Sequence, residues 1–532
     1  MNTVVLRILR IVRGGRYSSL AFSLLLLLHI IVFALLSWVL PIQYEENDDV
    51  MMCMIANGIY GGEPDCHLVF INAIIGYLLK SLYNVTHAIE WYTLMLAIIQ
   101  IVSMSTLAYQ IITADKFSKW LKICCCSLLY LFWIRIIATF QFTTTSGISA
   151  FAGCVILLNG KKWDYIYAFL LILTSALIRI EVALMMLLLF SPLFLRMVIS
   201  YRKHIVTFTI LTLLVISCPL IDNTFYSTPE WKYFKQYNTL RGKINDNPNF
   251  FRAKEKLPDG ISYDEDYYMF LWGVGDGKVF SLDKVRDIYN TLHHPSFMVK
   301  LKHFKNIVVS KKYFIPVLII LLLTLLVIIN TKSSYRWYLL AIIGLFIGVF
   351  VLISMNAYVK DRVFLCMLLP ISYALTLSMA NEYDNLSKKM KWCILGCFLV
   401  MMCFYDVSAI CRNNETALLE DGYAEQCNLL QQTKDYVYDF DCGIAMKNVW
   451  HIKDFPAQPI ILGWLTYIPL SKHILLGYDD FVKNNIVIFS EIGNTTTVDR
   501  IQNYLLNKYD MDVQYSILNQ SEHYILYQIT QK

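Results

Sequence analysis

Long apolar runs separated by short polar stretches dominate the pattern of the chain. A membrane span needs about 20 mostly apolar residues, because the lipid core offers backbone groups no hydrogen-bond partner. The run 21–40 meets this requirement, and its only ionisable side chain is His29. The same pattern predicts twelve apolar segments in all: 18–40, 67–83, 89–112, 121–138, 144–159, 164–179, 182–199, 205–221, 313–330, 336–354, 362–380 and 392–410. We therefore expect an α-helical polytopic membrane protein with about 11–12 transmembrane segments.

Two regions depart from this pattern and divide the chain. Residues 222–312 are polar and aromatic and contain turn signals, so they predict helical pieces joined by turns. In the tail 411–532, strand-like runs at 485–489, 513–517 and 524–528 flank or follow a stretch at 497–508 with helical spacing. The sequence thus predicts a membrane domain over 1–410 and a small α/β domain over 411–532.

Composition agrees with a chain that is embedded in lipid. Hydrophobic residues make up 57% of the sequence and charged residues 16%, against about 25% charged residues in soluble domains. The net charge of +6 is spread along the chain, which argues against a nucleic-acid partner. The fourteen cysteines form no CxxC pair and show no Cys/His metal spacing, so we expect them to pack as small apolar side chains.

Basic residues predict the orientation in the membrane. Four arginines precede the first apolar run and place the N-terminus in the cytoplasm: Arg7, Arg10, Arg13 and Arg16. Basic clusters at 161–162, 202–204 and 388–391 are expected on the same side. The loop 222–312 and the C-terminal domain then lie outside a plasma membrane. Consistent alternation requires one early segment that does not cross fully, and the short segment 67–83 is our candidate.

An inverted topology after the early segments is the alternative. A basic cluster directly before segment 313–330 favours it: Lys300, Lys302, Lys305, Lys311 and Lys312. This cluster ends a long loop, where the positive-inside rule has less weight. We therefore prefer the version in which 222–312 is extracytoplasmic.

Charged residues that border the apolar segments are the candidates for chemistry. Glu45, Glu46, Asp48 and Asp49 follow the first span, within the loop 41–66. Such carboxylates can serve as a general base, as ligands of Mg²⁺ or Mn²⁺, or as both. The simpler interpretation is an acidic turn that caps a helix over 50–59.

Basic groups are predicted on the same outer face. Arg179 and Glu181 lie at the tip of a helical hairpin, where they can also simply pair with each other. Arg362 begins segment 362–380, and Arg135 lies inside 121–138 without an evident partner. His67 is a further polar residue near this boundary. Arginine suits phosphate because its planar fork donates two parallel hydrogen bonds, so the set fits a substrate that carries a sugar and a lipid-borne phosphate.

These residues also resemble a known family. Asn47-Asp48-Asp49 after the first helix, the glycine-containing stretch 51–83 and the Asp-Arg-Val-Phe context of Arg362 are similar to the GT-C superfamily of integral membrane glycosyltransferases, in its bacterial type. The usual His-Pro-Pro is replaced by Cys66-His67-Leu68, and a second acidic motif is absent. The resemblance implies Asp48 or Asp49 as the catalytic base, a polyprenyl-phosphate sugar donor and a basic residue, Arg362, near the donor phosphate. Arg179 matches the family's mid-chain arginine less specifically.

The expected function is that of a glycosyltransferase. It would move a sugar from the lipid-linked donor to a cell-envelope glycan or lipid acceptor, and Arg179, Glu181, Arg362 and His67 would bind substrate. A polysaccharide polymerase or ligase that uses loop arginines such as Arg241 and Arg252 is one alternative. A transporter or flippase of lipid-linked glycans is another, although the chain shows few charges within its apolar segments and no internal repeat.

Overall fold

The computed structural model of the chain describes the following residues: 18–40, 42–159, 164–202, 204–245, 276–291, 297–330, 334–356, 359–380, 387, 396, 419–430, 437–439, 449–455, 459–460, 463–465, 467–470, 479–483, 487–493 and 495–532. The N-terminal arginines, Arg252 and the expected segment 392–410, apart from residue 396, lie outside these ranges.

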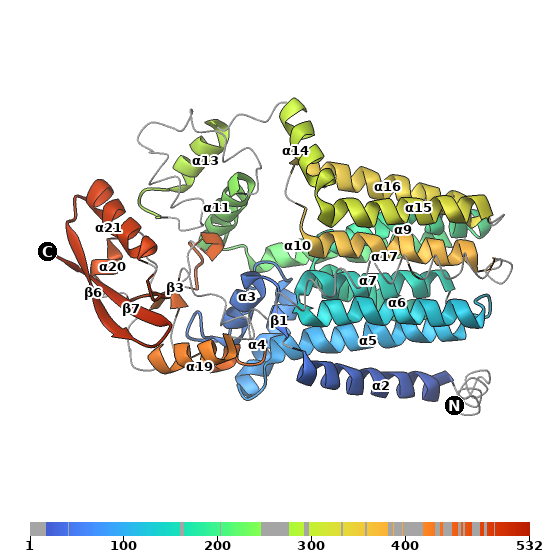
Figure 1. The fold of residues 1–532 in the computed structure, drawn as a ribbon, viewed down its shortest axis with the longest axis horizontal. Helices are drawn as coiled ribbons and strands as arrows, with labels where there is room; N and C mark the ends of the chain where they lie inside the picture. The colour runs from blue at the N-terminus through green and yellow to red at the C-terminus, as the bar shows by residue number, and fades with distance from the viewer. Residues whose placement is uncertain are drawn as a thin grey trace.

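A bundle of long helices forms one half of the molecule (Figure 1). Among the described residues, nine helices are long and apolar enough to cross a membrane. Their bounds are Ser18–Val39 (α2), Trp91–Thr113 (α5), Lys119–Ala138 (α6), Phe142–Asn159 (α7), Ile180–Ser200 (α9), His204–Phe225 (α10), Lys311–Asn330 (α15), Tyr335–Asn356 (α16) and Asp361–Met379 (α17). A shorter apolar helix, α8 (Asp164–Ile178), packs against α7. The helical, membrane-type architecture predicted from hydropathy is confirmed.

The position of each helix in the bundle follows from its side chains. Helix α7 is rich in Gly, Ala, Ser and Thr and is almost entirely buried, since small residues let neighbouring backbones approach closely. A Cβ atom at Gly147 would lie 2.3 Å from the Sγ of Cys366 in α17. By contrast, α2 and α10 expose many leucines and isoleucines, which are the side chains that a bilayer would cover.

Short elements between the spans gather at one end of the bundle. Strands β1 (Gln43–Tyr44) and β2 (Thr139–Phe140) pair in parallel there, next to helices α3 (Asn47–Asn57) and α4 (Ala73–Val85). The Tyr44 hydroxyl lies 2.6 Å from that of Thr93, so the end of α2 and the start of α5 meet at this end. Segment 67–83, which contributes a loop and most of α4, therefore adds no crossing between α2 and α5.

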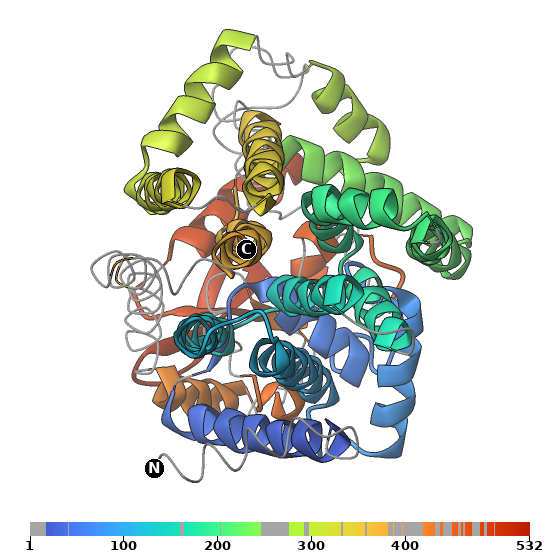
Figure 2. The ribbon, with the colours of Figure 1, turned by 90° about the vertical axis from the view of Figure 1, so that its right-hand side faces the viewer.

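The polar parts of the chain lie at the same end. From the middle of the chain come α11 (Pro229–Asn245), α13 (Leu282–Thr291) and α14 (Phe297–Val309). From the C-terminal part come α19 (Leu419–Leu430), β3 (Val437–Asp439), the 3-10 helices η4 (Ile452–Asp454) and η5 (Gly463–Leu465), β4 (Pro459–Ile460), α20 (Asp480–Lys483), β5 (Val487–Glu491), α21 (Thr496–Tyr509), β6 (Val513–Gln520) and β7 (Tyr524–Gln531). Figure 2 views the bundle from its opposite end, with these parts behind it.

The C-terminal sheet has five strands among the described residues, in the order β4-β3-β5-β7-β6. Strands β3, β4 and β5 are parallel, whereas β7 is antiparallel to β5 and β6. Helix α21 buries Val498, Ile501 and Leu505 against the sheet. The predicted strands and helix of this domain correspond to β5, α21, β6 and β7.

Specific contacts tie the polar parts together. The Lys278 ammonium lies 2.6 Å from the Asp479 carboxylate, which joins the middle region to the C-terminal domain. The backbone N–H of Lys453 donates to Glu90 at 2.8 Å, and Thr93 donates to the carbonyl of Val449. The C-terminal part is thus anchored on the end of the bundle that carries the acidic loop.

Candidate functional site

The acidic loop continues directly into a helix. Helix α3 begins at Asn47, three residues before the expected start, so Asp48 and Asp49 both lie in its first turn. Carboxylates are favourable there, because the helix N-terminus carries partial positive charge. Consecutive helical residues point about 100° apart. The two aspartates therefore enter different surroundings.

Asp49 is fully buried and holds the loop in place. Its Oδ1 accepts hydrogen bonds from the Tyr92 hydroxyl at 2.8 Å and from the backbone N–H of Phe142 at 3.1 Å. Its Oδ2 is buried and has no hydrogen-bond partner in the described part of the chain. Burial raises the pKa of Asp49 well above its ordinary value, although both hydrogen bonds lower it. Asp49 thereby links α3 to the starts of α5 and α7.

Asp48 contacts Arg362, which lies at the start of α17. The Nη2 atom of Arg362 lies 3.8 Å from Asp48 Oδ2, and its Nη1 lies 2.7 Å from Glu46 Oε1. The Asp48 side chain keeps 23% of its surface exposed, whereas that of Arg362 keeps 12%. Burial raises the pKa of Asp48, and the nearby charge of Arg362 partly offsets this. Of the two aspartates, Asp48 is therefore the one whose carboxylate is accessible from the surface.

Arg179, at the tip of the hairpin between α8 and α9, lies close enough to Asp48 for its charge to act on that carboxylate. It occupies the N-cap position of α9, and its charge, like that of Lys360, lowers the pKa of Asp48. Its guanidinium lies 5.5 Å from the ring centroids of both Phe70 and Phe142. Its Nε also pairs with Glu181 at 3.0 Å, and Glu181 is mostly exposed. Arg179 is thus held between two aromatic rings and a flanking carboxylate.

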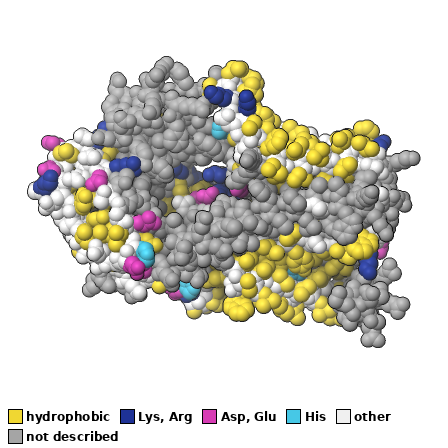
Figure 3. Space-filling model, in the orientation of Figure 1, with side chains coloured by type: hydrophobic (Ala, Val, Ile, Leu, Met, Phe, Trp, Pro, Cys, Tyr) yellow, Lys and Arg dark blue, Asp and Glu magenta, His cyan; other side chains and the backbone are white. Residues whose placement is uncertain are grey.

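The aromatic rings beside Arg179 belong to a cluster that three parts of the chain form. Trp464 of η5 packs against Phe70 with ring centroids 4.8 Å apart, and Phe70 stacks on Phe142 at 6.3 Å. The indole N–H of Trp464 is buried and has no partner in the described part of the chain. The C-terminal part therefore contributes directly to the surroundings of Arg179. Figure 3 shows acidic and basic side chains exposed in a hollow between the bundle and the polar parts.

Arg135, which has no evident partner in the sequence, lies near the acidic loop. It is 1% exposed near the end of α6. Burial raises the pKa of Glu45, and the charges of Arg362 and Arg135 lower it. The parallel pairing of β1 with β2 brings the two regions together, and the Glu45 N–H donates to the Phe140 carbonyl at 3.1 Å. Arg135 thus supports the acidic loop from within the bundle.

His67 belongs to a different set of contacts. Its Nδ1 lies 2.7 Å from Asp65 Oδ1, its Nε2 lies 3.2 Å from the Phe225 carbonyl, and its ring stacks on Trp231 at 4.2 Å. Burial lowers the pKa of His67, but the hydrogen bonds and charge interactions with Asp65 and Cys66 together outweigh it and raise the pKa to about 10. These contacts join the loop before α4 to the end of α10 and to α11. They do not include the acidic residues around Arg362.

The geometry does not fit a metal ion shared by Asp48 and Asp49. Asp49 turns towards Tyr92 and Phe142, whereas Asp48 faces the positive charge of Arg362. Among the described residues, ligand atoms of Asp65, Cys66 and His67 lie within 4.8 Å of one another. Both ring nitrogens of His67 are already engaged there, so this group is an ion pair rather than a preformed metal site.

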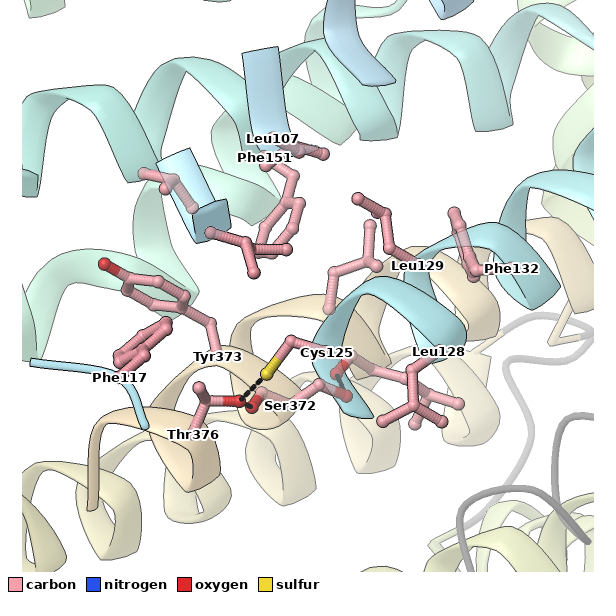
Figure 4. Close-up of a pocket in the computed structure, with 14 residues that line it drawn as sticks. Leu107, Phe117, Cys125, Leu128, Leu129, Phe132, Phe151, Ser372, Tyr373 and Thr376 are labelled. Carbon is pink, nitrogen blue, oxygen red and sulfur yellow. Dashed lines mark hydrogen bonds between the residues drawn. The ribbon is translucent and has the colours of Figure 1, made fainter. Parts of the chain in front are cut away.

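An apolar cavity lies deeper in the bundle, apart from the charged residues. Helices α5, α6, α7 and α17 line it, with Phe151, Leu368 and Tyr373 among its walls (Figure 4). Its volume is about 110 Å³, which is less than that of an engineered 150 Å³ cavity that binds benzene. Along α17 it begins about 9 Å below Arg362, at 1.5 Å per residue. The cavity can take a short apolar group but not a whole lipid chain.

Of the predicted site residues, the structure brings together Asp48, Arg362 and Arg179. Glu46 joins them as the closest partner of Arg362. Asp49 and His67 make separate contacts elsewhere. The aromatic residues around Arg179 had no signal in the sequence, because they come from a loop, a helix start and the C-terminal domain. Comparisons with known protein families, with curated proteins and with solved structures found no match to this chain.

Proposed function

We propose that this chain is a membrane glycosyltransferase of the GT-C type, which moves a sugar from a polyprenyl-phosphate donor to a cell-envelope glycan or lipid acceptor. The observation that carries the proposal is the pairing of a partly exposed carboxylate, Asp48, with Arg362 at one end of a bundle of apolar helices. A reaction at this place needs a base for a hydroxyl and a cation for a phosphate, and its donor must be anchored in lipid.

In the proposed reaction Asp48 is the general base. It takes the proton of an acceptor hydroxyl while the hydroxyl oxygen attacks the anomeric carbon of the donor sugar. The bond from that carbon to the phosphate oxygen breaks, and polyprenyl phosphate leaves with the electron pair. The N–H groups of Arg362 stabilise the negative charge of the leaving phosphate. Direct displacement of this kind inverts the anomeric configuration.

The other residues support this arrangement. Burial raises the pKa of Asp48, which makes its carboxylate a better proton acceptor than an exposed one. Arg179 adds a second positive charge near Asp48, and Phe70 and Phe142 provide apolar faces beside it. We assign Asp49 the role of a positioning residue, because it is buried and bonded to Tyr92 and Phe142. In this arrangement the active site is extracytoplasmic and the membrane is the plasma membrane.

The polymerase alternative receives less support from the described residues. Arg241 in α11 donates from Nε and Nη2 to Asn238 one turn earlier, at 3.2 and 3.1 Å. Its guanidinium is thus occupied within its own helix, and no aspartate or glutamate of the acidic loop pairs with it in the described part of the chain.

The test uses purified protein in lipid nanodiscs with a panel of radiolabelled polyprenyl-phosphate sugars and an envelope-lipid extract as acceptor. We expect transfer by the wild type and by Asp283→Asn, a control on the exposed surface of α13. Transfer should fall at least 100-fold in Asp48→Asn, since general-base catalysis contributes about 10²–10⁴-fold, and strongly in Arg362→Ala. Donor binding without transfer by any protein, wild type included, would contradict the proposal.

A further inference from the structure

Helix α14 is a basic helix that the proposed reaction does not use. Its thirteen residues contain no aspartate or glutamate, and they contain three lysines and a histidine: Lys300, Lys302, His303 and Lys305. The residues that follow it, Lys311 and Lys312, extend the positive charge of the sequence. Lysines this close together repel one another unless negatively charged groups lie nearby.

The helix lies where two spans end. The Nζ of Lys300 donates to Oδ1 of Asn356, the last residue of α16, at 2.8 Å. Helix α15 starts at Lys311, two residues after α14 ends at Val309, and α14 packs against both α15 and α16. Figures 1 and 2 show that α14 runs across the direction of the bundle helices rather than along it. This is the orientation of a helix that lies in the plane of a membrane surface.

One face of α14 points away from the protein and mixes apolar with basic side chains. Met298, Lys302, Lys305 and Val309 follow one another at spacings of four, three and four residues, which places them on one face. Met298 is 70% exposed and Val309 is 66% exposed. Neither lysine has an acidic partner in the described part of the chain. Figure 3 shows basic side chains next to hydrophobic ones over this helix.

We propose that α14 binds anionic phospholipid head groups at the membrane surface next to α15 and α16. Met298 and Val309 would contact the apolar boundary, while the stems of Lys302 and Lys305 lie along it and their ammonium groups reach head-group phosphates. The charge of the helix is complementary to an anionic lipid, and its neighbours α15 and α16 place it beside the bilayer. This inference does not depend on glycosyl transfer.

The experiment measures which lipids the full-length protein retains. The protein is reconstituted in nanodiscs of phosphatidylcholine and phosphatidylglycerol in equal amounts, and lipids that remain bound after extraction are quantified by mass spectrometry. The test variant is Lys302→Gln with Lys305→Gln. The matched control is Lys232→Gln with Lys508→Gln, which removes two charges from α11 and α21. A third variant, Lys302→Arg with Lys305→Arg, keeps the charge.

We expect the wild type, the control and the arginine variant to be enriched in phosphatidylglycerol over the bulk ratio. The glutamine variant at α14 should lose enrichment by about 25-fold at low salt, since each of the two lysines contributes about a factor of five near an anionic surface. High salt should weaken the enrichment of the wild type. Equal enrichment in the α14 glutamine variant and the control, or no enrichment in any protein, would overturn the proposal.

Discussion

Arg362 Nη2 lies 3.8 Å from Asp48 Oδ2, and this ion pair joins the start of α17 to the first turn of α3. The two residues come from opposite ends of the membrane domain in sequence. Glu46 strengthens the junction through its 2.7 Å contact with Arg362 Nη1. The charged site is therefore assembled by the fold of the whole bundle rather than by one loop.

Substitutions at Asp49 test whether this residue is structural. Asp49→Asn keeps an acceptor for the Tyr92 hydroxyl and the Phe142 N–H, so it should cost about 1 kcal/mol or less. Asp49→Ala leaves both donors buried without a partner and should cost about 2–4 kcal/mol. Thermal unfolding of both variants in the same detergent measures the difference. Equal destabilisation by Asn and Ala would show that the hydrogen bonds do not account for the role of Asp49.

The pH dependence of transfer tests Asp48 as the base. Burial raises the pKa of Asp48 above its ordinary value, and the base acts in its deprotonated form. Transfer should therefore rise with pH through this raised pKa, above the value of about 3.9 for a solvated aspartate. Arg362→Gln should move this acid limb to higher pH, because the charge of Arg362 lowers the pKa of Asp48. A profile of kcat/KM against pH with the same acid limb in both proteins would argue against this assignment.

The His67–Asp65 pair predicts a loss of stability at alkaline pH. The pKa of His67 is raised to about 10 in the folded protein, against about 6.5 when unfolded. A group whose pKa is higher in the folded than in the unfolded protein stabilises the fold fully at pH values below the unfolded pKa. This contribution is lost as the pH rises through the folded pKa. The wild-type Tm should therefore fall more steeply between pH 7 and pH 10 than that of His67→Asn. Parallel curves for the two proteins would exclude a stabilising charged His67.

Gly76 tests the packing of α4 on the preceding loop. A Cβ atom at Gly76 would lie 1.9 Å from the carbonyl oxygen of Cys66, and this backbone atom cannot move aside locally. Gly76→Ala should therefore destabilise the protein by about 2–3 kcal/mol. Gly344→Ala in α16 is the matched control, because its Cβ would meet no atom within 4 Å. Thermal unfolding of both variants should show a lower Tm for Gly76→Ala alone.

Hydropathy was sufficient to predict the helical bundle, because a lipid solvent imposes long apolar helices on any spanning chain. The same reasoning could not find β1 and β2, since two-residue strands leave no periodic pattern. It also missed β3 and β4, which are three and two residues long. Long elements with a clear period, such as α21 and β7, were predicted within a few residues.

The sequence predicted which residues form the charged site but not how they are arranged in space. The acidic string and Arg362 were visible in the sequence because they directly border apolar runs. The distinction between Asp48 and Asp49 depended on where α3 begins, and the spacing of the carboxylates alone does not fix that residue. The proximity of Arg135 to Glu45 and the position of Arg179 between Phe70 and Phe142 are contacts between distant segments. Only the packing of the bundle creates them.

The role of Asp48 is tested most directly by separating donor binding from transfer in Asp48→Asn and Asp49→Asn. Both variants in nanodiscs would be assayed for equilibrium binding of a polyprenyl-phosphate sugar that the wild type uses, and then for single-turnover transfer. We predict wild-type binding by both variants, transfer at least 100-fold slower in Asp48→Asn, and a smaller loss in Asp49→Asn. Transfer by Asp48→Asn at the wild-type rate would exclude Asp48 as the catalytic base.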